Sequence, residues 1–341
     1  MKHHKGIHHI TVLAGEAQLN VEFYTNKLGM RLVKKSVNQD DPGTYHLFYG
    51  NQAAEPGSSL TFFPWPMAQK GETGVGEVVN VALQVPKSSK AYWKDRLNEH
   101  EVKFKTVVVF GREALRFEDP DGLELDIVFE GEAKPQAENV DYIVPAEHSI
   151  QGFWGARMLL TEKQHAEMLL GDLFGFEEAA AEGNQTLYQT DAPIGRNVII
   201  EKADKPKYGK NGRGIVHHIA FRAENEEELD TLRQKVGKKG LNPTQIIDRH
   251  WFKSVYYRIP AGVLFEMASD DPGYTVDEEF EHLGEKLILP PWLESKRDRI
   301  EQILPDIVGS LCILILLLVR MAFLLYDSYK MTKSNSTHLY I

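Results

Sequence analysis

Hydrophobic and polar positions alternate in short segments of the chain, and a stretch with helical spacing interrupts them at regular points. From residue 6 to 66 this pattern predicts a strand at 7–13, a helix at 17–28 and strands at 31–37, 45–49 and 59–63. Glycine and proline separate most of these segments, as they do between elements of folded proteins. The first part of the chain is therefore expected to form a unit of one strand, one helix and three strands.

The same order of elements recurs three more times, at about residues 77–131, 150–202 and 214–269. Equivalent positions keep their spacing, because the step from His9 to Gly29 and the step from Gly155 to Gly175 both span 20 residues. A repeated unit of this length indicates internal duplication. We therefore expect an α+β fold of four βαβββ modules.

Superposing the modules shows which polar positions are equivalent. When the turn 260–262 is placed on the turn 120–122, Glu266 falls on Asp126, and when 220–221 is placed on 82–83, His218 falls on Asn80. The first and the last strand of each module thus offer one inward position each. In module one the first-strand position holds His9, and in module three it holds Gly155.

Only modules one and four carry a histidine at the first-strand position. If one metal ion is bound by both histidines, these two modules must close together into one open barrel. Modules two and three would then form a second open barrel around Asn80, Asp126 and Gly155, which we expect to be structural because it lacks the imidazole ligands of an iron or zinc site.

The candidate metal ligands are His9, His218 and Glu266. Adjacent strand residues face opposite sides, so only one histidine of each pair, His8-His9 and His217-His218, can point into the barrel. The superposition selects the second of each pair. Two histidines and one carboxylate are the set that holds non-haem Fe(II) with coordination positions left open. The alternatives are core or surface histidines held by hydrogen bonds, and a solvated carboxylate at position 266.

Composition narrows the function classes. Hydrophobic residues make up 42% and charged residues 26% of the 341 residues, as in ordinary globular proteins. The net charge is -10 and basic residues do not cluster with aromatic ones, which argues against a nucleic-acid partner. The single cysteine, Cys312, excludes a disulfide framework and a thiolate cage. This composition, and a start without a secretory pattern, favour the cytoplasm.

Domain boundaries are expected near residues 140 and 304, which gives domains at 1–140 and 141–304 and a tail at 305–341. Within the tail, residues 307–326 are apolar over about the length that crosses a bilayer, although Arg320 interrupts them. Three interpretations stay open: sequence foreign to the protein, such as an altered reading frame, a membrane-associating tail, or a helix packed on the body. A membrane partner is expected only for the second.

Over residues 6–304 the chain resembles the vicinal oxygen chelate superfamily of glyoxalases, bleomycin resistance proteins and extradiol dioxygenases, and within it the ring-cleaving and hydroquinone 1,2-dioxygenases. The resemblance rests on the motifs at 6–11, 45–50, 216–221, 248–256 and 260–266. It implies Fe(II) held by His9, His218 and Glu266, with His8, Arg249 and Tyr256 as supporting catalytic residues, and it ends after Pro305.

The expected function is cleavage of a hydroquinone or catechol-type ring by O2 on Fe(II), with Mn(II) as the alternative metal. Arg249 and Tyr256 could bind a second substrate hydroxyl, and His8 could relay a proton, although a surface cation and core side chains are the plainer interpretations. The aromatic residues that could line an apolar substrate pocket are Phe48, Phe63, Trp251 and Phe252.

Two other functions remain open at this point. A glyoxalase-like isomerase or thiol transferase usually takes a fourth protein ligand from the last strand of module one, where this chain has Phe62-Phe63. A protein that only sequesters small molecules would leave the three candidate ligands without a role. The residues leave ring substituents and a possible homo-oligomer undecided.

Overall fold

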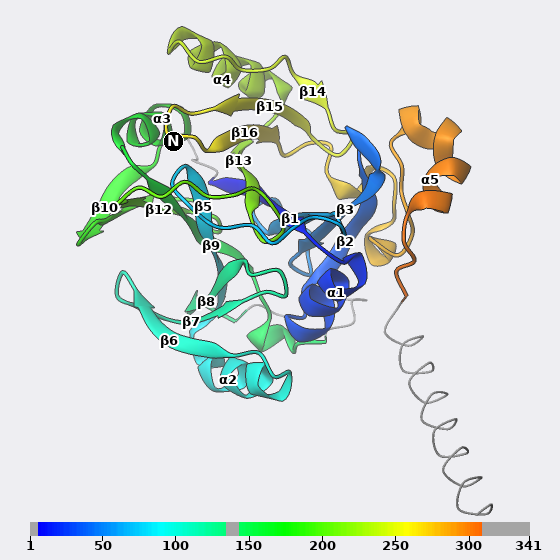
Figure 1. Ribbon diagram of the computed structural model, residues 1–341, viewed down its shortest axis with the longest axis horizontal. Helices are drawn as coiled ribbons and strands as arrows, with labels where there is room; N and C mark the ends of the chain where they lie inside the picture. The colour runs from blue at the N-terminus through cyan, green and yellow to red at the C-terminus, as the bar shows by residue number, and fades with distance from the viewer. Residues whose placement is uncertain (1–5, 134–142, 309–341) are drawn as a thin grey trace, which may run out of the picture. The chain divides into compact units, whose positions relative to one another are not determined.

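The strands of the chain form two eight-stranded sheets, each curled into an open barrel (Figure 1). The computed structural model describes residues 6–133 and 143–308. The two sheets are built from equivalent strands in the same relative order, as expected for a duplicated module. The predicted α+β fold with two open barrels is therefore confirmed.

The first sheet combines modules one and four. Its strands, in spatial order, are β14 (Ile247–Asp248), β15 (Lys253–Arg258), β16 (Leu264–Ser269), β13 (Val216–Ala223), β1 (Ile7–Ala14), β4 (Ser59–Pro64), β3 (Asp41–Gly50) and β2 (Arg31–Asn38). At its centre β1 runs antiparallel to β13, with Thr11 opposite His218. The first module of the chain is thus joined directly to the last.

The second sheet combines modules two and three in the same way. Its strands, in spatial order, are β10 (Glu177–Glu182), β11 (Gln185–Gln189), β12 (Asn197–Lys202), β9 (Gly152–Leu160), β5 (Glu77–Pro86), β8 (Glu124–Gly131), β7 (Arg112–Glu118) and β6 (Phe104–Val109). The central pair is β5 with β9, in which Asn80 lies opposite Arg157. This register is equivalent to that of Thr11 and His218 in the first sheet.

Each module carries one helix after its first strand. These are α1 (Ala17–Val21), which continues as the π-helical turn η1 (Glu22–Lys27), then α2 (Lys90–Glu99), α3 (Gln164–Phe174) and α4 (Glu226–Lys238), and α5 (Arg297–Ile303) follows the last module. The Asn225 side chain caps α4 by accepting a hydrogen bond from the backbone N–H of Glu228. Three glutamates in the first turn stabilise the helix, because their negative charges lie at the positive end of its dipole. The helix predicted at 17–28 is confirmed as α1 and η1, which together span Ala17–Lys27.

Short 3-10 turns complete the described elements: η2 (Lys87–Ser89), η3 (Ala146–His148), η4 (Tyr274–Val276), η5 (Phe280–His282) and η6 (Pro291–Lys296). The strand predicted at 45–49 is longer, because β3 begins at Asp41 and pairs with β2 from Asn38 onward. The sequence pattern did not predict this extension, because Pro42 and Gly43 are residues that ordinarily mark turns.

A buried cation connects β2 with the segment that follows the last strand. Lys34 is fully buried, and its Nζ donates to the carbonyl of Tyr274 at 2.9 Å, to Asp277 Oδ1 at 2.6 Å and to Glu278. Asp277 also accepts a 2.8 Å hydrogen bond from the Trp251 indole. Removal of Lys34 would leave Asp277 and Glu278 without their buried cation, which is costly.

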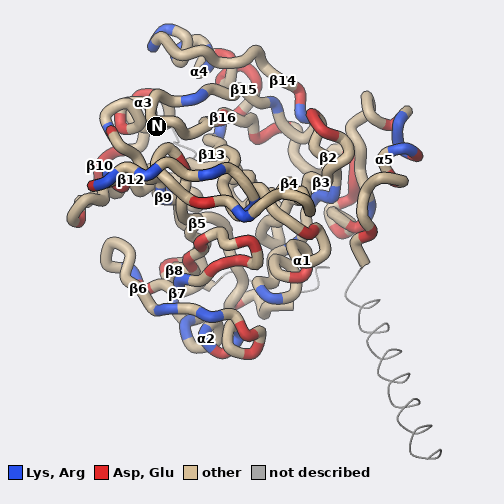
Figure 2. Tube along the Cα trace, in the orientation of Figure 1, with Lys and Arg blue, Asp and Glu red and all other residues tan. Residues whose placement is uncertain are grey.

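Residues 1–304 form one compact unit and residues 305–341 a second. Each sheet takes strands from both sides of residue 140. The domain boundary expected near residue 140 therefore stays a prediction. The apolar segment 307–326 lies, beyond its first two residues, outside the described part of the chain. Within 6–133 and 143–308, no helix is long and apolar enough to cross a membrane. Acidic and basic residues are interspersed along both sheets (Figure 2).

Candidate metal centre

Three side chains from neighbouring strands converge inside the first barrel. His9 comes from β1, His218 from β13 and Glu266 from β16, and the strand order β16-β13-β1 makes them neighbours. The two Nε2 atoms are 3.2 Å apart, and Glu266 Oε2 lies 3.1 Å from His9 Nε2 and 2.9 Å from His218 Nε2. The residues are 1%, 4% and 0% exposed. The structure thus brings together all three predicted ligands.

The spacing and chemistry of these atoms fit a bound cation. Ligand atoms about 2.1 Å from an ion and at right angles to one another would lie roughly 3 Å apart, as these three do. Glu266 Oε2 is buried and, among the described residues, has no hydrogen bond of acceptable geometry. A buried carboxylate oxygen without a partner is costly, and a cation would remove that cost.

The protonation states also suit metal binding. Burial alone would raise the pKa of Glu266, but the adjacent His9 and His218 outweigh it and hold the pKa well below its usual value. Burial lowers the pKa of His218, and the charge of Glu266 offsets this only in part. The site therefore presents an ionised carboxylate and a neutral imidazole at neutral pH.

Each candidate histidine ligand is contacted at its Nδ1 atom by the histidine that precedes it in the sequence. His8 Nδ1 lies 2.8 Å from His9 Nδ1, and His217 Nδ1 lies 2.8 Å from His218 Nδ1. His8 is buried, whereas His217 is exposed. The hydroxyl of Ser254 donates to Glu266 Oε1 in the same supporting manner. Neither His8 nor His217 belongs to the group of converging ligand atoms.

A cavity lies against two of the three candidate ligands, His9 and His218, and we call it the substrate cavity. It is lined by His9, Asn38, Gln39, Asp40, His46, Phe48, Phe63, His218, Arg249, Trp251, Phe252 and Tyr256. The four aromatic residues expected from the sequence are all present. Its volume is about 30 Å³, which is enough for an ordered water molecule.

Arg249 and Tyr256 lie together at one side of this cavity. Tyr256 pairs with Glu266 across β15 and β16, and its ring is 5.6 Å from that of His218. The Arg249 guanidinium lies over the Tyr256 ring at 5.4 Å. It also pairs with Asp40 at 3.0 Å, while Gln39 donates to the Arg249 carbonyl at 2.9 Å. These contacts close the mouth of the cavity.

His46 is a cavity residue that the sequence interpretation did not single out. It lies on β3, its Nε2 is 3.0 Å from Thr61 Oγ1, and its ring packs 3.9 Å from that of Phe48. Burial, followed by the charges of His9 and His218, lowers its pKa well below the usual value. The signal was present in the sequence, because alternation along a strand places residues 46 and 48 on one face.

The equivalent positions of the second barrel carry ion pairs. Asp126, which corresponds to Glu266, receives two 2.7 Å hydrogen bonds from Arg116. Asn80, which corresponds to His218, donates to Glu124 Oε1 at 3.1 Å, and Gly155 has no side chain in the place of His9. A guanidinium group therefore satisfies the carboxylate that a metal ion would satisfy in the first barrel.

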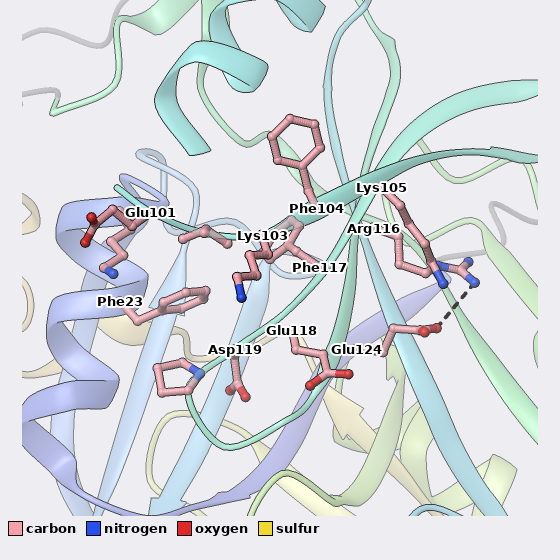
Figure 3. A pocket seen from close by; sticks show the side chains of 13 residues that line it. Phe23, Glu101, Lys103, Phe104, Lys105, Arg116, Phe117, Glu118, Asp119 and Glu124 are labelled. Carbon is pink, nitrogen blue, oxygen red and sulfur yellow. Dashed lines mark ion pairs between the residues drawn. The ribbon is translucent and has the colours of Figure 1, made fainter. Parts of the chain in front are cut away.

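A wide cleft lies between η1 and the second barrel, apart from the converging ligands. It measures about 550 Å³, and Figure 3 shows Phe23 and Phe117 in its wall beside Lys103, Glu118 and the ion pair of Arg116 with Glu124. Charges of both signs line it, and they are largely balanced. We therefore place the chemistry at the smaller cavity beside the ligands.

Asp119, in the wall of this cleft, gives a prediction for stability. Its Oδ1 accepts the backbone N–H groups of residues 121, 122 and 123, and burial raises its pKa to about 6. The folded protein thus holds this proton more tightly than the unfolded chain, so the stabilisation is complete below pH 4 and is lost as the pH rises through 6. For Asp119→Asn we expect a free energy of unfolding higher by roughly 1–3 kcal/mol at pH 7.5.

Urea unfolding at pH 4, 6 and 7.5 measures this difference. The gain of Asp119→Asn should shrink toward pH 4, where the native carboxyl is protonated as well. Asp298→Asn, at an exposed position of α5, serves as the control. An equal difference at all three pH values would show that burial of the charge is not the cause.

Known proteins and structures resemble this chain over most of its length. The model of the Glyoxalase/Bleomycin resistance protein/Dioxygenase superfamily matches residues 6–127 and 168–276. MhqO of Bacillus subtilis (strain 168), named a candidate ring-cleaving dioxygenase, is 40% identical over 297 residues, which are 87% of this chain and 95% of MhqO.

Two further comparisons agree. The chlorohydroquinone/hydroquinone 1,2-dioxygenase of Sphingobium indicum is 33% identical over 313 residues, covering 89% of this chain and 96% of that protein. A crystal structure of a candidate dioxygenase from Bacillus subtilis superposes with a TM-score of 0.84 at 38% identity, covering 90% of this chain and 99% of the other.

Proposed function

From the premise that the chain belongs to the glyoxalase, bleomycin resistance protein and dioxygenase superfamily, and is an enzyme of its dioxygenase group, we propose that it is an Fe(II)-dependent ring-cleaving dioxygenase. The substrate is a small aromatic ring with hydroxyl groups, of the hydroquinone or catechol type. O2 is the second reactant, and both of its atoms enter the ring-opened product.

The observation that carries this proposal is the convergence of His9 Nε2, His218 Nε2 and Glu266 Oε2 within 3.2 Å of one another. These three residues would hold the metal on one side and leave its other positions toward the substrate cavity. A bound Fe(II) supplies a charge that acidifies a substrate hydroxyl and a redox centre that activates O2. Mn(II) fits the same donor atoms.

The aromatic walls and polar end of the substrate cavity position the ring. Phe48 and Phe252 offer apolar faces for the ring, and Tyr256 and Arg249 offer an O–H group and N–H groups. We assign to Arg249 and Tyr256 the binding of the substrate oxygen that lies away from the metal. Arg249 is paired with Asp40, so a hydrogen bond from Arg249 to a substrate oxygen would compete with this ion pair.

We assign positioning roles to His46 and His8. His46 lines the cavity, and burial holds its pKa well below the usual value, so a neutral His46 would orient a substrate hydroxyl by a hydrogen bond rather than take its proton. His8 contacts His9 instead. To bind an ion through Nε2, a neutral His9 carries its proton on Nδ1 and donates it to His8 Nδ1. We therefore assign His8, and likewise His217, to holding the ligand rings in place.

The test is O2 uptake by protein loaded anaerobically with Fe(II). We expect uptake with methylhydroquinone or a catechol, in equal amount to a ring-opened product detected by absorbance and mass spectrometry. Metal-free protein should consume no O2. Isomerisation of a glutathione hemithioacetal without O2 uptake would contradict the proposal and favour a glyoxalase-type activity.

A further inference from the structure

We propose that a second cavity, on the other side of Trp251 and Phe252, binds dioxygen and delivers it to the metal centre. This cavity, here called the Ala54 cavity, has a volume of about 250 Å³ and is lined in part by His8, Ala54, Trp251, Phe252, Tyr274 and Phe280. The proposal rests on the proposed function, because it concerns the second reactant of the same site.

The two cavities share a thin wall. Trp251 and Phe252 line both of them. The Phe252 ring lies 5.1 Å from the ring of His9, on the side of the ligands, and 5.3 Å from the ring of His8, on the side of the Ala54 cavity. One aromatic ring therefore separates the Ala54 cavity from a candidate metal ligand. A side-chain rotation of Phe252 would connect them.

The lining of the Ala54 cavity suits an uncharged apolar molecule. Trp251, Phe252 and Tyr274 are buried members of one apolar cluster, and Ala54 and Phe280 pack against it. Dioxygen is small and apolar, and in other proteins an apolar cavity of about 150 Å³ takes up xenon or benzene. The Ala54 cavity is larger than that.

Two carboxylates, Glu55 and Asp270, also belong to the lining of the Ala54 cavity. Both are held by neighbouring side chains, because Arg222 donates two hydrogen bonds of 2.8 and 2.9 Å to Asp270 and Asn51 donates to Glu55 at 2.7 Å. The wall toward the metal centre, formed by Trp251 and Phe252, is apolar.

The position of the Ala54 cavity makes it a second path to the ligands. Trp251 and Phe252 stand between it and the substrate cavity. A ring held in the substrate cavity would therefore leave the Ala54 cavity free for dioxygen.

Xenon and the substitution Ala54→Phe test the proposal. In metal-free crystals under xenon pressure we expect density in the Ala54 cavity of the native protein and none in Ala54→Phe. In Fe(II)-loaded protein, Ala54→Phe should raise the KM for O2 roughly tenfold while the KM for the aromatic substrate, kcat at saturating O2 and the iron content stay unchanged. Ala261→Phe, in a turn elsewhere on the first barrel, is the matched control.

Phe280→Trp fills the same cavity from its opposite wall and serves if Ala54→Phe does not fold. Absence of xenon from the native cavity, or an unchanged KM for O2 in the folded variants, would overturn the proposal. Xenon density in a protein that shows no ring cleavage would instead overturn the proposed function, and with it the delivery of O2 to this site. The two failures are therefore distinguishable.

Discussion

His218→Ala is expected to yield a folded protein that no longer retains iron and consumes O2 with methylhydroquinone only at the background rate. The substitution removes one of three converging ligand atoms and leaves Glu266, which is fully buried, next to a single histidine. Loss of a ligand should weaken metal binding by more than the roughly 10–100-fold that a supporting residue contributes. Iron content after gel filtration and O2-electrode traces measure both effects.

His282→Ala is the matched control, since the His282 side chain is 68% exposed and is not one of the three converging residues. It should keep both iron and activity. Titration with Fe(II) compares the two supporting histidines. His8→Ala should bind iron roughly 10–100-fold more weakly than the native protein. The loss of affinity in His217→Ala should be smaller, because water can replace its exposed ring. Unchanged turnover in His218→Ala would refute the assignment of the metal ligands.

Lys34→Met should destabilise the protein more than any exposed charge substitution. It leaves Asp277 and Glu278 without their buried cation, and breaking such a buried pair from one side costs about 3–5 kcal/mol. In a unit of this size we expect the melting temperature to fall by roughly 10 °C. Urea unfolding followed by circular dichroism gives the free energy of unfolding directly.

Two further variants test whether burial of the Lys34 cation is the cause of this loss of stability. Lys253→Met removes an exposed ion pair with Glu226 and should change stability by less than about 1 kcal/mol. The double variant Lys34→Met/Glu278→Gln should recover part of the loss, since one buried negative charge is removed with the positive one. Equal effects of Lys34→Met and Lys253→Met would show that burial of the cation is not what stabilises this region.

The architecture was predictable from the sequence because each module repeats the same order of elements at the same spacing. Because only modules one and four carry a histidine at the first-strand position, His9 and His218, one metal ion bound by both required these two modules to meet. The pairing of β1 with β13 agrees with this requirement. Local periodicity and repetition are properties of short segments, and a single sequence displays them directly.

Contacts between distant segments were not predictable in this way. Nothing near Arg249 in the sequence indicates its pairing with Asp40, which depends on how the turn after β2 folds over the cavity. His8 adjoins a ligand in sequence, yet its contact with His9 Nδ1 rather than with the cavity depends on an irregular register in β1 between Ile7 and His9. Such details arise from packing, and alternation of strand residues does not encode them.

The union of the first module with the last also determines when the protein can become active during its synthesis. His9 is made at the start of translation, whereas its partners His218 and Glu266 follow 209 and more residues later. Closing so long a loop is slow and costs chain entropy, so the first strand must wait for nearly the entire chain. A nascent or truncated chain that lacks the last module would therefore contain only one of the three proposed ligands, and it could not assemble a half-formed metal site that reacts with oxygen before the fold is complete.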